Sequence, residues 1–293
     1  MQPSGNFSGL WIPLITPFSN GAVDHPALTR LVHQLRPTGI AGFVVCGSTG
    51  EAAALDETEQ LAVLDTVVQA ASGLPIVMGV SGYHLPQTLA WVKTLATRSL
   101  TGLLAPAPHY IRPAQSGVLH WFNAIADVSP HPLIVYDIPY RTGVSIERGT
   151  FQALSRHPNI RAVKDCGGDA GKTQALIADG QLQVLAGEDA QIFSTVALGG
   201  SGAIAATAHV HTERFVRVLQ MLGQGELAQA RTHWRPLLPL IEALFGEPNP
   251  GPLKALLAHQ GLVQNELRAP MTPATSAHAQ GLIQLSDAIS ASE

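Results

Sequence analysis

The stretch PLIVYDIPYRTGVSIERGTFQALSRHPNIRAVKDCGG, residues 132–168, contains two short apolar runs joined by a longer helix-like segment. The runs at 132–138 and 161–166 are rich in β-branched and other apolar residues, as is typical of buried strands. The segment at 146–156 between them has the length and spacing of a helix. The stretch therefore predicts a strand, a crossover helix and a second, parallel strand.

The same alternation continues in both directions along the chain. Strand candidates lie at 9–16, 42–47, 75–80, 102–106, 132–138, 161–166, 183–187 and 202–207. Helix-like segments lie at 24–36, 57–71, 86–98, 116–127, 146–156, 171–179, 190–198 and 212–223. Eight such units predict an α/β fold, the (β/α)₈ TIM barrel, because a doubly wound sheet rarely needs so many. The pattern alone leaves the doubly wound sheet open.

The strand pattern stops after residue 223. We expect helical structure around 225–245 and 252–260, then a proline-bearing turn and a last helical segment near 273–290. Residues 1–223 are therefore predicted to form the (β/α)₈ barrel, and residues 224–293 a C-terminal helical extension of the same domain.

The composition favours a buried parallel core and disfavours binding to nucleic acid. Apolar residues make up 46% of the 293 residues and charged residues only 13%, which suits a sheet covered on both faces. The net charge is −4 without any basic run, whereas phosphate binding needs clustered Lys or Arg. No apolar run reaches about 18 residues and no signal peptide is visible. We expect a cytoplasmic protein in which Cys46 and Cys166 are buried thiols.

Lys164 is the clearest chemical signal, because it stands inside a strand candidate. Burying an unpaired ammonium group costs several kcal/mol. Burial therefore favours the neutral amine, which is a nucleophile toward carbonyl groups. From this residue alone, a lysine that pairs with Glu188 or Asp189 at a strand end is equally acceptable.

Tyr136 lies in the fifth strand candidate and favours the nucleophilic interpretation of Lys164 over the paired one. If strands five and six are neighbours and both side chains face inward, its phenol lies near the Lys164 amine. Schiff-base formation needs a group that donates and accepts a proton, and a phenol can do both. A lone strand tyrosine is more often a packing residue, but beside Lys164 we expect a catalytic role.

The turn at residues 47–51, with the sequence GSTGE, follows the second strand candidate and opens a helix. Its two hydroxyls and its free amides are suited to binding a carboxylate. It lacks a Walker lysine, and the chain has no GxGxxG pattern, so nucleotide binding is disfavoured. We expect no cofactor.

His209 and His211 alternate in a strand-like pattern and could share one side. No third ligand has a convincing spacing, so we favour a structural or solvent-exposed role over a metal site.

Seven motifs recur, in this order and spacing, in the dihydrodipicolinate synthase/N-acetylneuraminate lyase family, which the chain resembles from residue 12 to about residue 262. They are residues 47–51, 108–113, 136–143, 163–165, 187–189, 200–204 and 249–254. The resemblance implies a (β/α)₈ barrel with a C-terminal helical extension and a class I pyruvate aldolase mechanism. It also implies a homotetramer built from two tight dimers.

The resemblance further implies roles for four catalytic residues. Lys164 matches the Schiff-base lysine and Tyr136 the general acid/base. Ser48, where synthases commonly carry threonine, matches the hydroxyl that links two tyrosines in a proton relay. Tyr110 matches the relay tyrosine that reaches into the neighbouring subunit.

Substrate-binding residues are implied in the same way. Thr49 matches the contact to the pyruvate carboxylate, and Gly187 and Ile204 would line the pyruvate pocket. Arg141 matches the arginine that holds the carboxylate of aspartate semialdehyde in the synthase branch, and the lyases typically lack it. A guanidinium group suits a carboxylate.

The expected function is therefore that of a lyase that condenses pyruvate with L-aspartate 4-semialdehyde in lysine biosynthesis. Two alternatives stay open: another pyruvate-dependent aldolase or lyase of the same family, and a catalytically silent barrel that binds a 2-oxo acid.

Feedback by lysine is expected to be absent. The positions that match the lysine-binding residues of inhibited synthases are His109, Thr88 and either Glu57 or Gln60. Without a carboxylate at Thr88, nothing there pairs with the α-ammonium group of lysine.

Overall fold

A computed structural model describes residues 5–291 of the chain. Eight strands form one parallel sheet that closes on itself in the order β1-β10-β9-β8-β7-β6-β5-β4. Their bounds are β1 (Gly9–Pro13), β4 (Gly42–Val45), β5 (Ile76–Gly79), β6 (Gly102–Pro106), β7 (Leu133–Asp137), β8 (Ile160–Asp165), β9 (Gln183–Ala186) and β10 (Gly202–Ile204). The predicted (β/α)₈ barrel is thereby confirmed, and each strand lies inside or within one residue of its predicted range.

Helices alternate with these strands along the chain. They are α1 (His25–Leu35), α2 (Glu57–Ala71), α3 (Leu85–Leu95), α4 (Gln115–Val128), α5 (Pro139–Thr142), α6 (Arg148–Leu154), α7 (Ala170–Asp179), α8 (Ile192–Ala197), α9 (Thr212–Gly223), α10 (Leu227–Trp234), α11 (Leu237–Leu244), α12 (Gly251–His259) and α13 (Ser276–Ser290). Among residues 5–291, no helix is both long and apolar enough to cross a membrane.

Three local features were not expected from the sequence. A small antiparallel hairpin joins β2 (Phe18–Ser19) to β3 (Ala22–Val23). The short helix α5 follows β7 directly. The segment predicted as helical at 225–245 is divided into α10 and α11 before Leu237, where Pro236 has no backbone N–H to continue the hydrogen-bond pattern.

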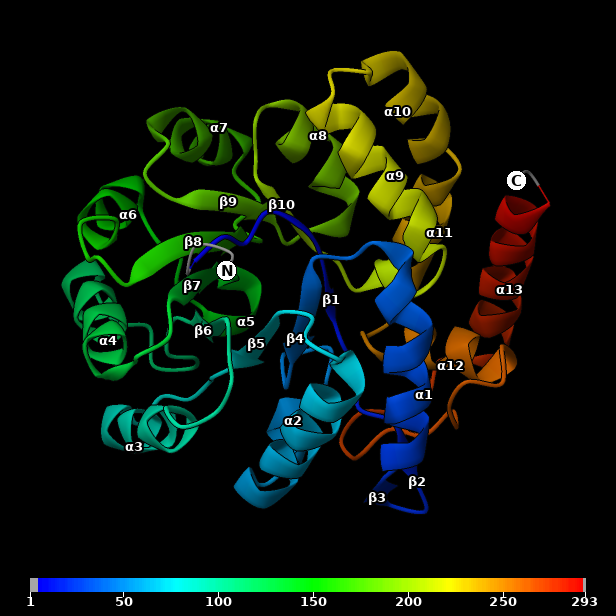
Figure 1. The fold of residues 1–293 in the computed structure, drawn as a ribbon, viewed down its shortest axis with the longest axis horizontal. Coiled ribbons are helices and arrows are strands. Elements are labelled where there is room, and N and C mark those ends of the chain that lie inside the picture. Colours follow the sequence, from blue (N-terminus) through cyan, green and yellow to red (C-terminus); the bar gives the residue numbers. More distant parts are fainter. Residues whose placement is uncertain (1–4, 292–293) are drawn as a thin grey trace. The chain divides into compact units, whose positions relative to one another are not determined.

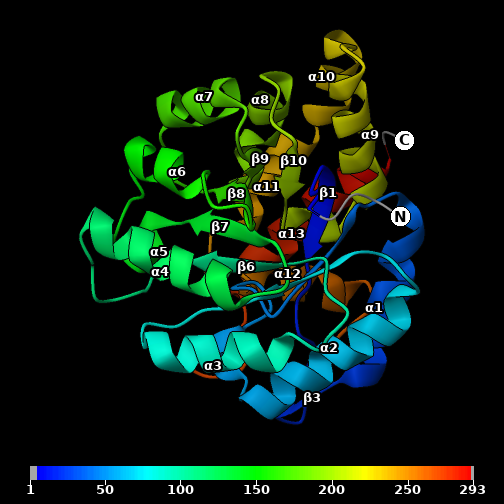
Figure 2. The same cartoon turned by 60° about the vertical axis from the view of Figure 1, so that its left-hand side comes forward.

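The chain forms two compact units, which we describe separately. Within the described residues, unit 1 comprises 5–9 and Pro75–Ile204, and unit 2 comprises Leu10–Leu74 and 205–291. Unit 1 contains β5 to β10 and α3 to α8, and its helices α4, α6 and α7 lie along one side of β7, β8 and β9 (Figures 1 and 2). In unit 2, α9 packs on α10, and α13 packs on α11 and α12. The predicted boundary at residue 223 stays a prediction.

The strands of unit 1 are buried along nearly their whole length, as expected for a parallel sheet. In β7 every residue is buried. The buried polar residues of β7 and β8 lie at the carboxyl ends, where Tyr136 pairs with Lys164 and Asp137 with Asp165. This is the end of a barrel at which active sites are built.

In unit 2, β1 pairs with β4 in parallel. Helix α2 begins after Asp56, whose carboxylate accepts a hydrogen bond from the Glu59 amide, while the Glu59 carboxylate accepts one from the Asp56 amide. This reciprocal arrangement satisfies two backbone donors that the first turn leaves without helical partners. Asp56 is therefore the N-cap of α2.

Candidate active site

Lys164 and Tyr136 face each other on neighbouring strands. The parallel ladder between β7 and β8 pairs the two residues directly. Both side chains are buried, and Lys164 Nζ lies 4.3 Å from the centroid of the Tyr136 ring. The predicted closeness of this amine and this phenol is confirmed.

Lys164 differs from the other buried lysines in that no ion pair with a carboxylate is found for it among the described residues. The chain contains four lysines, and Lys93 is exposed. Lys172 and Lys254 are buried and each pairs with a carboxylate at 2.5 Å. The ion pairs found among residues 5–291 include none of Lys164, so they give no support to the pairing with Glu188 or Asp189 that the sequence left open. The Lys164 amine is therefore available to a carbonyl group.

The Tyr136 phenol is buried, which disfavours its ionised form. Burial raises the pKa of Tyr136 well above its usual value, and Cys166 and Tyr140 raise it further, whereas Arg141 lowers it. Cys166 Sγ lies 3.9 Å from the phenol oxygen. A protonated phenol beside an amine can donate a proton to a departing oxygen and take one back.

Gly187 lies close to the side chains of both Lys164 and Cys166. A methyl group in place of its hydrogen would collide with Cys166 Sγ and would lie 2.9 Å from Lys164 Cγ. The backbone after β9 approaches Lys164 this closely because residue 187 has no side chain.

Helix α5 carries Tyr140 and Arg141 directly after the strand that carries Tyr136. Pro139 begins the helix, and Gly143 ends it in the left-handed region with φ of 80°. The Tyr140 hydroxyl donates to Glu188 Oε1 at 3.1 Å. Arg141 is exposed, so its guanidinium group is accessible to an anion.

The GSTGE turn lies in unit 2. The Thr49 side chain is buried, and its hydroxyl accepts a hydrogen bond of 3.1 Å from Asn249 Nδ2. Ser48 is exposed. A side chain at Gly50 would lie 2.8 Å from the Leu14 carbonyl oxygen. Unit 2 therefore presents Ser48 and Thr49 on a closely packed turn, and their approach to Lys164 stays a prediction.

Tyr110 and Ile204, two further residues predicted for the site, also belong to unit 1. Tyr110 follows β6, is 88% exposed and has φ of 75°, a strained conformation for a residue with a side chain. Ile204 is the buried last residue of β10. Lys164, Tyr136 and Gly187 are thus in contact within unit 1, and Arg141 follows Tyr136 by five residues.

His209 has a structural role. Its Nε2 accepts a hydrogen bond from the Ile15 amide at 3.3 Å, which leaves Nδ1 to donate to the Ala206 carbonyl oxygen at 2.8 Å. His211 Nε2 lies 3.0 Å from the Ser286 hydroxyl oxygen. These contacts support the predicted structural role of both histidines.

Sequence reasoning missed two features next to this site. The sequence pattern indicates Cys166 only as a buried thiol, yet it is the neighbour of the Tyr136 hydroxyl. The pattern assigns no role to Lys172, although this residue lies on the buried side of α7 together with Thr173 and Leu176. A lysine at a helix position where the period predicts an apolar residue is the signal that could have revealed it.

The site can be compared with known proteins. The model of the Dihydrodipicolinate synthetase family matches residues 6–290. The chain is 37% identical over 269 residues to 4-hydroxy-tetrahydrodipicolinate synthase 2 of Clostridium acetobutylicum, covering 90% of this chain and 94% of that protein. A crystal structure of the chloride-inhibited dihydrodipicolinate synthase from Acinetobacter baumannii, complexed with pyruvate, is 29% identical with a TM-score of 0.94, covering 97% of this chain and 99% of that one. The enzyme from Cyanidioschyzon merolae with lysine bound is 28% identical with a TM-score of 0.93, covering 97% and 98%.

Proposed function

The chain belongs to the dihydrodipicolinate synthetase family, and on that premise we propose that it condenses pyruvate with L-aspartate 4-semialdehyde. This lyase reaction is that of a 4-hydroxy-tetrahydrodipicolinate synthase in lysine biosynthesis. One observation carries the proposal: a buried lysine, for which residues 5–291 supply no carboxylate in an ion pair, stands 4.3 Å from the centroid of a buried tyrosine ring. The pyruvate in the Acinetobacter baumannii relative supports pyruvate as the first substrate.

In the pyruvate half-reaction, Lys164 Nζ adds to the keto carbon and forms a carbinolamine. Tyr136 gives its proton to the departing hydroxyl, water leaves, and a Schiff base remains. Loss of a proton from the pyruvate methyl group then gives the enamine. The raised pKa of Tyr136 supports this role, because the phenol holds a proton until an acceptor arrives.

In the aldehyde half-reaction, the enamine carbon attacks the aldehyde carbon of the second substrate, and the new alkoxide takes up a proton. The amino group of that substrate then adds to the imine carbon, closes the ring and displaces the Lys164 amine. Arg141 binds the carboxylate of the aldehyde substrate through a charge-assisted contact. Its exposure in unit 1 supports this role.

The other site residues act on binding and proton transfer. Thr49 binds the pyruvate carboxylate, and the hydrogen bond from Asn249 supports this by holding its hydroxyl in place. Ser48 and Tyr110 pass protons between Tyr136 and solvent. Gly187 and Ile204 border pyruvate.

We further propose a homotetramer built from two tight dimers. Tyr110 reaches into the neighbouring subunit of the tight dimer, which accounts for an 88% exposed aromatic side chain held at positive φ. The reaction takes place in the cytoplasm, where thiols stay reduced; the free, buried Cys46 and Cys166 support this location.

The test has two parts. Borohydride reduction in the presence of pyruvate, followed by peptide mass mapping, should modify Lys164, and a coupled assay should show turnover of aspartate semialdehyde. An unmodified Lys164 would refute the Schiff-base mechanism. A modified Lys164 with turnover of a different aldehyde only would leave the aldolase mechanism and refute the synthase activity.

A further inference from the structure

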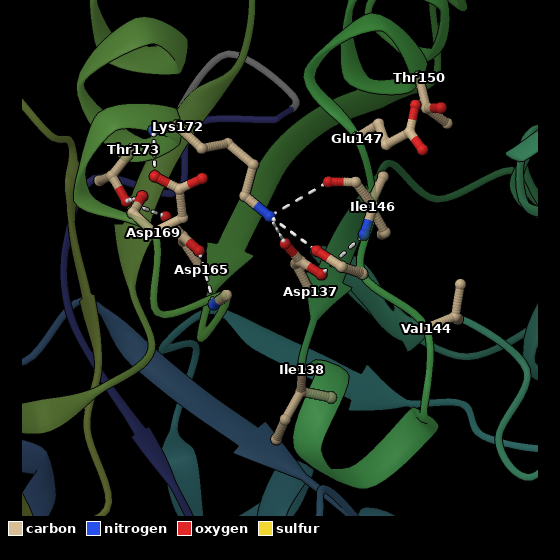
Figure 3. Close-up of polar contacts among 12 residues, drawn as sticks. Asp137, Ile138, Val144, Ile146, Glu147, Thr150, Asp165, Asp169, Lys172 and Thr173 are labelled. Atoms are coloured by element: carbon tan, nitrogen blue, oxygen red, sulfur yellow. Dashed lines mark hydrogen bonds and ion pairs between the residues drawn. The ribbon is translucent and has the colours of Figure 1, made fainter. Parts of the chain in front are cut away.

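A buried polar network lies on the face of β7 and β8 opposite to Tyr136 and Lys164. Successive side chains of a strand point to opposite faces, so Asp137 and Asp165, which follow Tyr136 and Lys164, point away from them toward α7. Figure 3 shows both carboxylates turned toward the first turn of that helix. All four side chains of the network, those of Asp137, Asp165, Lys172 and Thr173, are buried.

Lys172 joins three separate segments of unit 1. Its Nζ lies 2.5 Å from Asp137 Oδ2 at the end of β7. It also donates to the Ile146 carbonyl oxygen at 3.1 Å (Figure 3). A further hydrogen bond of 3.4 Å runs to the Ser145 hydroxyl. Asp137 Oδ1 in turn accepts a hydrogen bond from the Ile146 amide at 3.3 Å. Lys172 and Asp137 thus hold this turn through the N–H and C=O groups of Ile146 and through the Ser145 hydroxyl.

Thr173 forms a parallel connection to the other strand. Its hydroxyl donates to Asp165 Oδ2 at 2.5 Å, and Asp165 Oδ1 accepts from the Gly167 amide at 2.8 Å. The Asp169 carboxylate caps α7 by accepting from the Lys172 amide at 3.0 Å. The cap fixes the first turn of α7, from which both Lys172 and Thr173 project.

Gly167 leaves the space in which the ion pair forms. A methyl group there would lie 2.7 Å from Asp137 Oδ2 and 2.8 Å from Lys172 Nζ. These distances are too short for a carbon atom next to two polar groups. The pair is therefore enclosed on the side of the β8–α7 connection by a residue without a side chain.

Stability alone is a weak reason for such a pair. Taking two charges out of water costs about as much as their attraction returns, and apolar replacements are often neutral. Burial raises the pKa of Asp137 even though Lys172 opposes the shift, which reflects that cost. The pair instead fixes a position: it connects the turn at 145–146 to the end of β7. The four residues of α5, with Arg141 among them, lie in the chain between these two tied points.

We propose that Lys172 is a positioning residue for the aldehyde half-reaction. With Asp137 it holds the turn at Ser145 and Ile146, and thereby sets α5 and Arg141 relative to Tyr136. The proposal rests on the proposed function, since it assigns Arg141 to the second substrate. It concerns the aldehyde and not pyruvate, because the Lys172 contacts run to the two ends of the segment that carries Arg141.

The experiment is a double-mutant cycle on Lys172→Met and Asp137→Asn, with Lys93→Met as the control for the same chemical change at an exposed lysine. Lys172→Met should lower the melting temperature and raise KM for the aldehyde about tenfold or more, because small misplacements of a binding group are costly. KM for pyruvate and the rate of borohydride trapping should stay close to wild type. The double variant should regain stability, since no unpaired charge stays buried, but should keep the high KM for the aldehyde.

A second readout does not depend on the identity of the aldehyde. Hydrogen–deuterium exchange of the peptide that covers residues 139–147 should be faster in Lys172→Met and in the double variant than in wild type. Recovery of both the aldehyde KM and the exchange rate in the double variant would overturn the proposal. So would an equal rise of both KM values in Lys172→Met. A wild-type enzyme that turns over no aspartate semialdehyde would instead refute the proposed function, while the exchange measurement would still test the positioning role.

Discussion

Lys164 Nζ lies 4.3 Å from the centroid of the Tyr136 ring, and the two residues are direct partners in the ladder between β7 and β8. They are 28 residues apart in sequence, so the parallel register brings them together rather than any local turn. Amine and phenol are held by two rigid strands, which keeps their geometry constant before substrate enters.

Replacing Lys164 by Met should abolish both Schiff-base trapping and turnover, because the other lysines are either exposed or held by carboxylates. Borohydride reduction with pyruvate and mass mapping provide the measurement. Tyr136→Phe should retain slow trapping, with turnover lower by roughly 10²–10⁴-fold, as is typical when a general acid/base is removed. Lys93→Met should behave as wild type. Full turnover in Lys164→Met would contradict the mechanism.

Replacing Arg141 by Gln should weaken binding of the aldehyde without affecting pyruvate. Loss of a charge-assisted contact to a carboxylate is expected to cost about 2 kcal/mol, or roughly 30-fold in KM for the aldehyde. Steady-state kinetics with each substrate varied in turn provide the measurement, and borohydride trapping of pyruvate should be unchanged. Unchanged kinetics with aspartate semialdehyde would remove the reason for choosing this aldehyde over others.

The buried ion pair between Lys254 and Glu51 should be sensitive to removal of either partner alone. Lys254 Nζ lies 2.5 Å from Glu51 Oε1, donates to the Glu266 carbonyl oxygen at 2.8 Å and lies 4.2 Å from the centroid of the Phe18 ring. Lys254→Met should lower the free energy of unfolding by about 3–5 kcal/mol, because it leaves a buried carboxylate unpaired. The double variant Glu51→Gln, Lys254→Met should recover much of that loss.

Urea denaturation of the single and double variants measures this coupling. Lys93→Met serves as the control, because its side chain is exposed. Additive losses in the double variant would show that the two groups do not compensate each other.

His209 should make the protein less stable in mild acid. Burial lowers the pKa of His209 from 6.5 to about 4, so the unfolded chain binds a proton between these values and the folded chain does not. Its contribution is complete above pH 6.5, falls as the pH drops toward 4 and is absent below that. The shift corresponds to roughly 3 kcal/mol.

Thermal or urea unfolding between pH 7 and pH 4 tests this, with His209→Gln compared with wild type. The stability advantage of wild type over the variant should shrink as the pH falls. The exposed His120 offers a matched control through His120→Gln. Parallel pH profiles for wild type and His209→Gln would contradict the prediction.

Lysine should not inhibit turnover. Thr88, the position predicted to lack the required carboxylate, is buried in α3, and its hydroxyl donates to the His84 carbonyl oxygen at 3.2 Å. It therefore offers no negative charge to an α-ammonium group. Initial rates at increasing lysine concentration provide the measurement, and a relative such as the Cyanidioschyzon merolae enzyme, whose structure has lysine bound, is the comparison. Half-maximal inhibition at sub-millimolar lysine would refute it.

Hydrophobic periodicity by itself determined the eight strands, most of the helices and the placement of Lys164 and Tyr136 near strand ends. Periodicity is a local property, read within a window of some ten to fifteen residues. It could not predict the division of 225–245 into α10 and α11, where a single proline changes the outcome, or the four-residue helix α5, which is shorter than the window.

Only the tertiary structure decided which carboxylates the other two buried lysines meet. Lys172 and Asp137 are 35 residues apart, and Lys254 and Glu51 are 203 apart. Each of these lysines alone is compatible with an exposed position. Their partners depend on the register of parallel strands and on where each helix returns to the sheet. The strand register and the helix positions are set by packing of the whole chain, because no contact between neighbouring residues specifies them.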